Sequence, residues 1–217
     1  MTHAEFAQTR ADFEIIARWI EPNNRVLDLG CGDGALLKWL RETRPIACCG
    51  VELDDHAVLE AVANNIPVIQ SDLENGLQDF AAHSFDKVIL SRTLQTVRQV
   101  EVILSEMLRV ADEAIVSFPN FAYWKNLKSV LKGKMPVSED LPYSWHDSPN
   151  VRFFTLADFE ALCDDLNIQI LEKHLLNADG TAVAAPPEFS ADDVNFLTSL
   201  VVCRLGRAKT AKNPRST

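Results

Sequence analysis

The sequence lacks any apolar run near the roughly 20 residues that a membrane-spanning helix needs. Residues 1–18 carry acidic side chains and have no apolar stretch followed by a cleavage site of small residues, so nothing there indicates an export signal. We therefore expect a cytoplasmic protein with no membrane partner.

Cysteines are few and follow no metal-ligand spacing. The chain has five of them: Cys31, Cys48, Cys49, Cys163 and Cys203. An odd number of scattered thiols indicates reduced cysteines in a reducing compartment rather than a disulfide framework. No metal site is expected.

Basic residues are outnumbered: 21 Lys and Arg face 31 Asp and Glu, which gives a net charge of −10 at pH 7. The one internal basic cluster is Lys125, Lys128, Lys132 and Lys134. Helical spacing places the first three on one face, which we interpret as a solvated helix face. A surface that follows a phosphate backbone needs more clustered Lys and Arg, so nucleic acid is not an expected partner.

What the chain does have is the composition of an ordinary globular protein. Its 217 residues are 47% hydrophobic and 24% charged. That length fills one core but hardly a second domain. We expect a single domain over residues 1–206, followed by a basic, disordered tail over residues 207–217.

Short apolar runs alternate with helical patterns along most of the chain. After an opening amphipathic helix within residues 4–20, strands are expected at residues 25–29, 47–52, 68–70, 85–91, 114–118, 168–173 and 199–204. Helices are expected from residue 34, and over residues 55–64, 100–110, 121–131 and 155–165, with a loop over residues 177–193. The inner strands are apolar throughout rather than alternating, which is typical of parallel strands covered by helices on both faces. The pattern predicts an α/β fold.

Residues 119–150 interrupt this alternation with a segment rich in proline and aromatic residues. It contains Pro136, Pro142, Tyr143 and Trp145. Long insertions in compact domains are usually functional, so we expect this one to contact a ligand or a partner.

The most informative stretch is Val26-Leu27-Asp28-Leu29-Gly30-Cys31-Gly32-Asp33-Gly34, in which a buried strand runs into a turn with glycine at alternate positions. Glycine tolerates positive φ and lets a ligand approach the backbone closely. In a doubly wound sheet this turn lies at the carboxyl edge of the first strand, where ligands bind.

The acids of this turn favour a cationic ligand. The spacing is G-x-G-x-G and not the G-x-G-x-x-G of dinucleotide folds. Asp33 would place an anion at the helix N-terminus, which repels phosphate, and Asp28 adds negative potential. S-adenosylmethionine (AdoMet), a sulfonium cation with an amino-acid tail, suits that field.

Two further acids stand where an adenosine group needs them. Glu52 ends the second expected strand, about 18 residues after Gly34, like the ribose-binding acid of nucleotide-binding βαβ units. Asp72 follows the third strand and is positioned to accept from the adenine amino group. The expected cofactor-binding residues are Asp28, Gly30, Gly32, Asp33, Gly34, Glu52, Asp72, Leu73 and Ser91, with AdoMet or S-adenosylhomocysteine as the ligand.

Residues 25–118, with this turn and these acids, resemble the class I AdoMet-dependent methyltransferases. The resemblance implies a Rossmann-like fold with a seven-stranded, mostly parallel sheet, its last strand antiparallel, and helices on both faces. The motif is specific to the fold rather than to a substrate.

A narrower resemblance covers nearly the whole chain. Pro119-Asn120-Phe121, Met135-Pro136-Val137 and Leu141-Pro142-Tyr143-x-Trp145 are similar to the MetW family of methionine biosynthesis proteins. That resemblance implies a partner subunit that is required by, or modulates, homoserine O-acyltransferase, the first committed enzyme of bacterial methionine synthesis.

The alternative is an independent AdoMet-dependent methyltransferase with a small-molecule acceptor. Such an enzyme often needs a base near the acceptor. His146 and Asp147 are the only obvious acid or base candidates near the crevice. Asn120 is a further candidate, by hydrogen bonding to an acceptor. A turn that ends the fifth strand explains Asn120 equally well.

Overall fold

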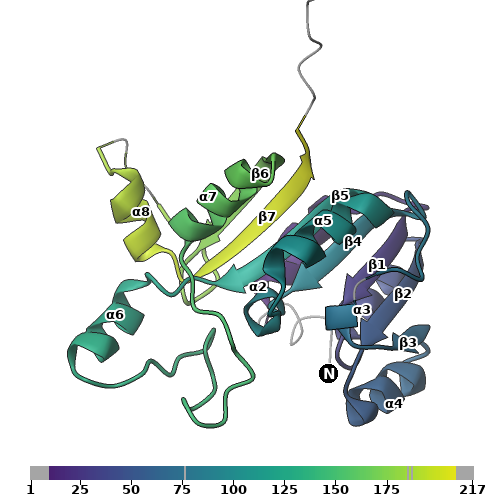
Figure 1. Ribbon diagram of the computed structural model, residues 1–217, viewed down its shortest axis with the longest axis horizontal. Helices are drawn as coiled ribbons and strands as arrows, with labels where there is room; N and C mark the ends of the chain where they lie inside the picture. Colours follow the sequence, from purple (N-terminus) through teal and green to yellow (C-terminus); the bar gives the residue numbers. More distant parts are fainter. Residues whose placement is uncertain (1–9, 76, 185, 187, 209–217) are drawn as a thin grey trace, which may run out of the picture.

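The computed structural model describes residues 10–75, 77–184, 186 and 188–208, which form one seven-stranded sheet with helices on both sides (Figure 1). The strand order is β3-β2-β1-β4-β5-β7-β6. The strands are β1 (Arg25–Leu29), β2 (Ala47–Glu52), β3 (Val68–Gln70), β4 (Phe85–Ser91), β5 (Ala111–Pro119), β6 (Ile168–Leu176) and β7 (Leu200–Arg207).

The first five strands are parallel, and β7 runs antiparallel to both β5 and β6. The expected α/β, Rossmann-like sheet with its last strand antiparallel is confirmed. The chain order reverses between β1 and β4, so the carboxyl ends of these strands form the switch point at which open α/β sheets bind ligands.

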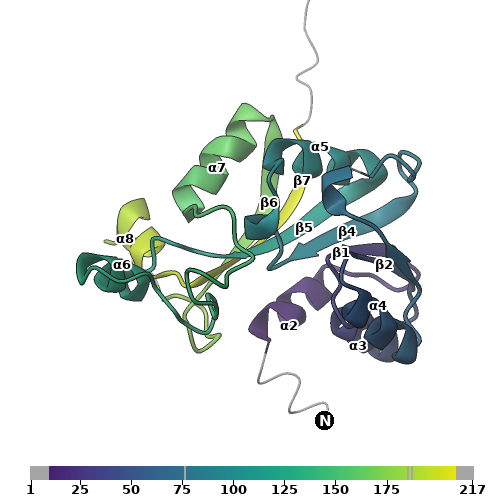
Figure 2. The ribbon, with the colours of Figure 1, turned by 60° about the horizontal axis from the view of Figure 1, so that its bottom comes forward.

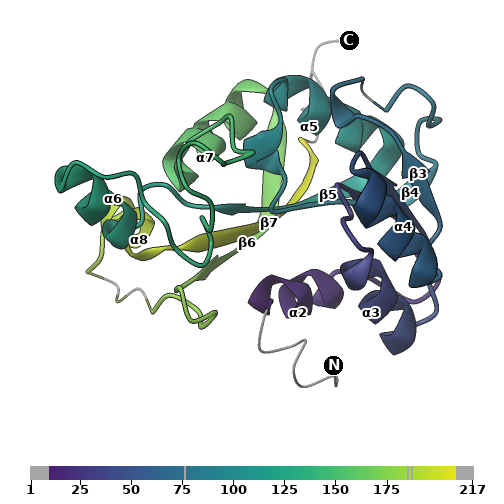
Figure 3. The ribbon, with the colours of Figure 1, turned by 90° about the horizontal axis from the view of Figure 1, so that it is seen from below.

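The helices are α2 (Ala11–Arg18), α3 (Ala35–Thr43), α4 (Asp55–Ala63), α5 (Val100–Val110), α6 (Trp124–Leu131), α7 (Leu156–Asp165) and α8 (Ala191–Leu197), with short 3-10 turns η1 (Leu73–Asn75) and η2 (Leu94–Thr96). Figure 3 shows α2 and α3 on one side of the sheet and α5 and α7 on the other. No helix within the described ranges combines the length and apolar character that crossing a bilayer requires.

Each face of the sheet has its own core. On the face of α2 and α3, the side chains of Ile16 and Leu37 pack against Ile89 and Ile115. On the face of α5 and α7, Met107 and Phe159 pack against Val88 and Phe118. Burial on both faces explains why the inner strands are continuously apolar.

The segment after β5 leaves the sheet. Figures 1 and 2 show α6, α8 and the chain between α6 and α7 gathered beyond the end of the sheet where β5 finishes. Leu131 and Trp145 of this segment are 88% and 77% exposed, which is unusual for side chains of their size. The insert expected at residues 119–150 thus carries an exposed apolar surface, although its first residue still belongs to β5.

Several expected boundaries were wrong. The opening helix, expected to reach Ile20, ends at Arg18, and α6 begins at Trp124 instead of residue 121. Residues 4–9 of the expected opening helix lie outside the described residues. The loop expected over 177–193 contains the start of α8, where Ser190 caps the helix by accepting from the Asp193 N–H at 3.2 Å. Arg207, expected in a tail, ends β7, because its guanidinium donates to the Leu108 carbonyl at 3.1 Å. The rest of that predicted tail, beyond residue 208, lies outside the described residues.

Candidate functional site

The glycine turn between β1 and α3 needs glycine for both conformation and space. Gly30, Gly32 and Gly34 have φ of 67°, 56° and 73°, values that residues with a Cβ rarely adopt. A Cβ on Gly30 would lie 2.7 Å from Thr93 Cγ2. The Gly30 N–H donates to the Val51 carbonyl at 2.8 Å, which fixes the turn to the neighbouring strand.

Glu52, at the end of β2, holds the turn from the other side. Its Oε2 accepts from the Gly32 N–H at 2.8 Å, and its Oε1 accepts from the N–H groups of Leu53 and Asp54 at 2.7 and 3.0 Å. A carboxylate has about four acceptor sites. One therefore remains for a donor from a ligand, such as a ribose hydroxyl.

Asp72, after β3, has one carboxylate oxygen available. Its Oδ1 accepts from the Glu74 N–H at 2.9 Å, whereas Oδ2 accepts no hydrogen bond within the described part of the chain. Such an oxygen suits the exocyclic amino group of an adenine.

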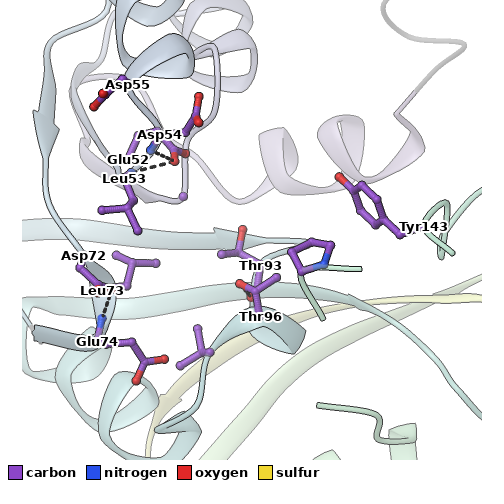
Figure 4. A pocket seen from close by; sticks show the side chains of 13 residues that line it. Glu52, Leu53, Asp54, Asp55, Asp72, Leu73, Glu74, Thr93, Thr96 and Tyr143 are labelled. Carbon is purple, nitrogen blue, oxygen red and sulfur yellow. Dashed lines mark hydrogen bonds between the residues drawn. The ribbon is translucent and has the colours of Figure 1, made fainter. Parts of the chain in front are cut away.

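These groups surround a cavity of about 920 Å³ at the carboxyl edge of the sheet, hereafter the cofactor cavity (Figure 4). Of the expected cofactor-binding residues, Gly30, Glu52, Asp72 and Leu73 line it. The remaining lining residues are Leu53, Asp54, Asp55, Glu74, Thr93, Thr96, Val97, Tyr143 and Pro149. The acids outnumber the cations here, so the cavity favours a positively charged ligand.

The other expected cofactor residues lie beside this cavity rather than in its wall. Asp33 is exposed and accepts from the Ala35 N–H at 3.1 Å, at the first turn of α3. Gly34 packs its backbone against Ile66. Gly32 is joined to the cavity through its hydrogen bond to Glu52.

Asp28 lies beneath the turn and is 3% exposed. Burial raises its pKa to about 7, the positive charge of Arg10 opposes this shift, and the negative charges of Glu52 and Asp12 add to it. Asp28 therefore carries a partial charge near neutral pH and contributes less negative potential than an ordinary aspartate would.

Ser91, at the end of β4, belongs to a polar network on the side of α2. Its hydroxyl donates to Asp12 Oδ2 at 3.0 Å and receives a hydrogen bond from Arg10 at 2.8 Å. Burial raises the pKa of Asp12, but the hydrogen bond and charge of Arg10, with the charge of Arg92, outweigh it and leave this pKa lowered. Asp12 is therefore an ionised, fully buried carboxylate.

Asn120, a catalytic candidate from the sequence, is fully buried and its amide is occupied. Its Nδ2 donates to the carbonyls of Asn195 and Thr198 at 2.7 and 2.9 Å. Its Oδ1 accepts from the Leu156 and Ala122 N–H groups at 3.1 and 3.3 Å. These bonds join β5 to α7 and α8, which is the structural role that the sequence had left open.

His146, the other candidate, is exposed and lines a separate cavity together with Met135, Val137 and Trp145. Its ring contacts that of Trp145, with 5.5 Å between centroids. The structure does not bring His146 into the wall of the cofactor cavity.

The described residues also hold no group of three or more His, Cys, Asp or Glu placed to bind a metal ion. All five cysteines are free. Burial, with the negative charges of Asp28 and Glu52, raises the pKa of Cys31 to about 12, so its thiol stays protonated.

Sequence reasoning missed Thr93, Thr96, Tyr143 and Pro149 as cavity residues. Thr93 and Thr96 sit in the turn after β4, whose carboxyl end faces the same edge of the sheet as β1. Their place directly after this strand was the sequence signal that could have identified them as cavity residues. Tyr143 and Pro149 come from the insert, and only the fold shows that it reaches back to this edge (Figure 4).

Solved structures that share this fold include AdoMet-dependent methyltransferases. A SAM dependent methyltransferase from Archaeoglobus fulgidus is 14% identical, with a TM-score of 0.67 over 94% of this chain and 94% of that chain. Magnesium protoporphyrin IX methyltransferase from Synechocystis, solved with bound SAH, is 15% identical, with a TM-score of 0.61 over 96% of this chain and 89% of that chain. The fold is that of the class I AdoMet-dependent methyltransferases.

The family within this class follows from sequence. The model of "Methionine biosynthesis protein MetW" matches residues 10–204, and the chain belongs to the MetW family. A bifunctional methionine biosynthesis protein MetXA/MetW from Rhodopirellula baltica is 39% identical over 195 residues. The match covers 83% of this chain but only 31% of that relative, so the chain spans about a third of the longer protein.

Proposed function

We propose that this chain binds AdoMet in the cofactor cavity and serves in methionine biosynthesis as the partner of a homoserine O-acyltransferase. The observation that carries the AdoMet part is the meeting of Gly30, Glu52 and Asp72 around one acidic cavity. The ligand is a cation with hydroxyl and amino donors, and these residues offer acceptors and negative charge.

Each group has a part in holding the ligand. Glu52 has one free acceptor site for a ribose hydroxyl, and Asp72 Oδ2 is free for the adenine amino group. Gly30 lets the ligand approach the backbone at the end of β1. When bound, AdoMet supplies an electrophilic methyl group or acts as a ligand that reports its own concentration.

The partnership is supported by the bifunctional relative, in which a MetW-like region is joined to MetXA in one protein. It is also supported by the exposed insert, because large exposed apolar and aromatic side chains are typical anchors of protein interfaces. Leu131 and Trp145 are the most exposed of these. The five free cysteines favour the cytoplasm as the compartment.

The partnership is tested by mixing the purified chain with a homoserine O-acyltransferase from the same organism. We expect co-elution and a change in acyltransferase rate. Trp145→Ala and Leu131→Ser should each weaken association about tenfold, the scale of a single interface anchor. Leu59→Ser is the matched control, because Leu59 is 69% exposed on α4, away from the insert. Separate elution with an unchanged rate would refute the partnership.

The alternative, an independent methyltransferase, gains no support from the two catalytic candidates, because Asn120 is occupied and His146 lies outside the cofactor cavity. Its test is the conversion of AdoMet to S-adenosylhomocysteine by the isolated chain across a panel of small-molecule acceptors.

A further inference from the structure

A second cavity, of about 340 Å³, lies on the other side of the segment that follows β4. Thr93 faces the cofactor cavity, whereas its neighbour Arg92 lines this second one, hereafter the Arg92 cavity. Its other polar lining residues are Glu139, Asp140, Asn177 and Asp179, which come from the insert and from the chain after β6.

Arg92 is held in a backbone conformation that residues with a Cβ seldom adopt. Its φ is 53°, and its N–H donates to the Ser117 carbonyl at 2.9 Å, which ties it to β5. Such strain persists only where the surrounding structure enforces it, and it gathers at functional sites. This conformation occurs at a residue that lines the Arg92 cavity.

The guanidinium of Arg92 is poorly satisfied. Its side chain is 23% exposed and lies 3.5 Å from Asp12 and 3.3 Å from Asp140. Both contacts are ion pairs. None of the guanidinium N–H groups makes a hydrogen bond within the described part of the chain, and the buried Nε has no hydrogen-bond partner there. A largely buried cation without hydrogen bonds is costly, so this group is ready to donate hydrogen bonds to the oxygens of a ligand.

Both neighbouring carboxylates, besides their ion pairs with Arg92, accept hydrogen bonds from other groups. Asp12 accepts from Arg10 Nε and Nη2 at 3.0 and 2.9 Å and from Ser91 at 3.0 Å. Asp140 Oδ2 accepts from the Ser199 hydroxyl at 2.5 Å. Arg92 is therefore charge-neutralised by two ion pairs, while its planar donor fork makes no hydrogen bond within the described part of the chain.

The cavity therefore places opposite charges a short distance apart: one guanidinium and the carboxylates of Glu139, Asp140 and Asp179. Guanidinium groups bind carboxylates in a forked geometry, and carboxylates bind ammonium groups. A volume of about 340 Å³ is at the small end of ligand sites and suits a small ligand.

We propose that the Arg92 cavity binds a small α-amino acid. Its carboxylate lies on the Arg92 guanidinium, and its ammonium group faces Asp140 and Glu139. The site is separate from the cofactor cavity, and its ligand does not depend on AdoMet being bound.

The test is a titration of the full chain with L-homoserine, L-methionine and glycine, in which binding is measured by ligand-observed NMR. Two truncated analogues accompany them: 4-hydroxybutyrate, which lacks the ammonium group, and 3-amino-1-propanol, which lacks the carboxylate. We expect saturable binding of at least one amino acid. We expect each of the two analogues to bind at least tenfold more weakly than L-homoserine.

The variant Arg92→Lys keeps the charge but loses the fork and should weaken amino-acid binding at least tenfold. Glu139→Gln, at an exposed position, should weaken it severalfold without affecting folding. Both variants should bind AdoMet as the wild type does, which separates this proposal from the proposed function. If Arg92→Lys does not fold, Glu139→Gln and the two analogues decide. Absence of amino-acid binding at millimolar concentration, or affinity unchanged in the folded variants, would overturn the proposal.

Discussion

The carboxylate of Glu52 accepts a hydrogen bond from the backbone N–H of Gly32 at 2.8 Å, which joins the end of β2 to the glycine turn after β1. A residue expected to bind a ribose thus also shapes the turn. The acid and the turn form one unit, so a change at either alters the other.

Replacing Glu52 with Gln tests whether the carboxylate and the glycine turn act together in ligand binding. The amide would present a donor toward one of the N–H groups that the carboxylate now accepts, and the negative charge would be lost. We expect AdoMet affinity to fall at least tenfold in calorimetric titration. Asp55→Asn removes the same charge from the wall of the same cavity and should change affinity less than about threefold, the scale of an exposed charge. Equal losses in the two variants would show that only net charge matters.

Gly30 and Gly133 provide a matched pair for the glycine turn. Both have positive φ, but a Cβ on Gly30 meets Thr93 at 2.7 Å, whereas one on Gly133 meets no atom within 4 Å. Alanine at either position costs about 1 to 2 kcal/mol for the left-handed backbone, and Gly30→Ala costs more because of the contact. Urea unfolding measures both free energies. In the double variants, Thr93→Ala should recover part of the unfolding free energy lost in Gly30→Ala and none of that lost in Gly133→Ala. If the effects of the two substitutions were strictly additive in both double variants, the contact between position 30 and Thr93 would be contradicted.

Asp28 makes stability depend on pH. Because its pKa is about 7 in the folded chain and about 3.8 when unfolded, the folded state holds the extra proton between these values. Stability therefore falls as pH rises from about 4 to about 7, by at most about 1.4 kcal/mol per unit from this site. Asp28→Asn removes that contribution.

The measurement is urea unfolding of Asp28→Asn and of the wild type between about pH 5 and pH 8, where the difference isolates this site. The free energy of unfolding of Asp28→Asn should increase relative to that of the wild type as pH rises. Asp33→Asn, which removes a carboxylate from an exposed position of the same turn, is the control. Parallel curves for Asp28→Asn would mean that its carboxyl group is ionised throughout.

Asn120 should prove structural. Asn120→Ala leaves the buried Leu156 N–H and Thr198 carbonyl without their partner. We expect a loss of about 2 to 4 kcal/mol in unfolding free energy, because each unsatisfied buried group costs about 1 to 3 kcal/mol. AdoMet affinity of the folded variant should equal that of the wild type. A stable variant with reduced ligand affinity would reverse this assignment.

The sequence was sufficient for the sheet, since continuous apolar strands such as residues 85–91 need two covering layers and the glycine turn marks the ligand edge. It was insufficient where the outcome depended on contacts between distant segments. Nothing local showed that Tyr143 returns to the cofactor cavity, or that Asp12 and Asp28 are buried. The start of α8 was available in principle, because Ser190 and Asp193 form a capping box, but the nearby prolines favoured a loop.

Segments held by tertiary pairing were misjudged for the same reason. The strand β5 begins at Ala111, three residues before the apolar run that marks it, because Ala111 pairs with Phe85 of β4. His146 was selected by its chemistry alone, and its position depends on how the insert folds against Trp145. Local patterns carry no information about such long-range placement.

The central claim is that the cofactor cavity binds AdoMet in a chain that serves as the partner of a homoserine O-acyltransferase. The most direct measurement is calorimetric titration of AdoMet into the purified chain, alone and with a homoserine O-acyltransferase present. We predict micromolar binding to the chain alone, and an affinity that shifts when the partner is added, because ligand and partner affinities are reciprocally linked when they are coupled. No heat of binding with or without the partner, from a chain shown to be folded, would contradict the claim.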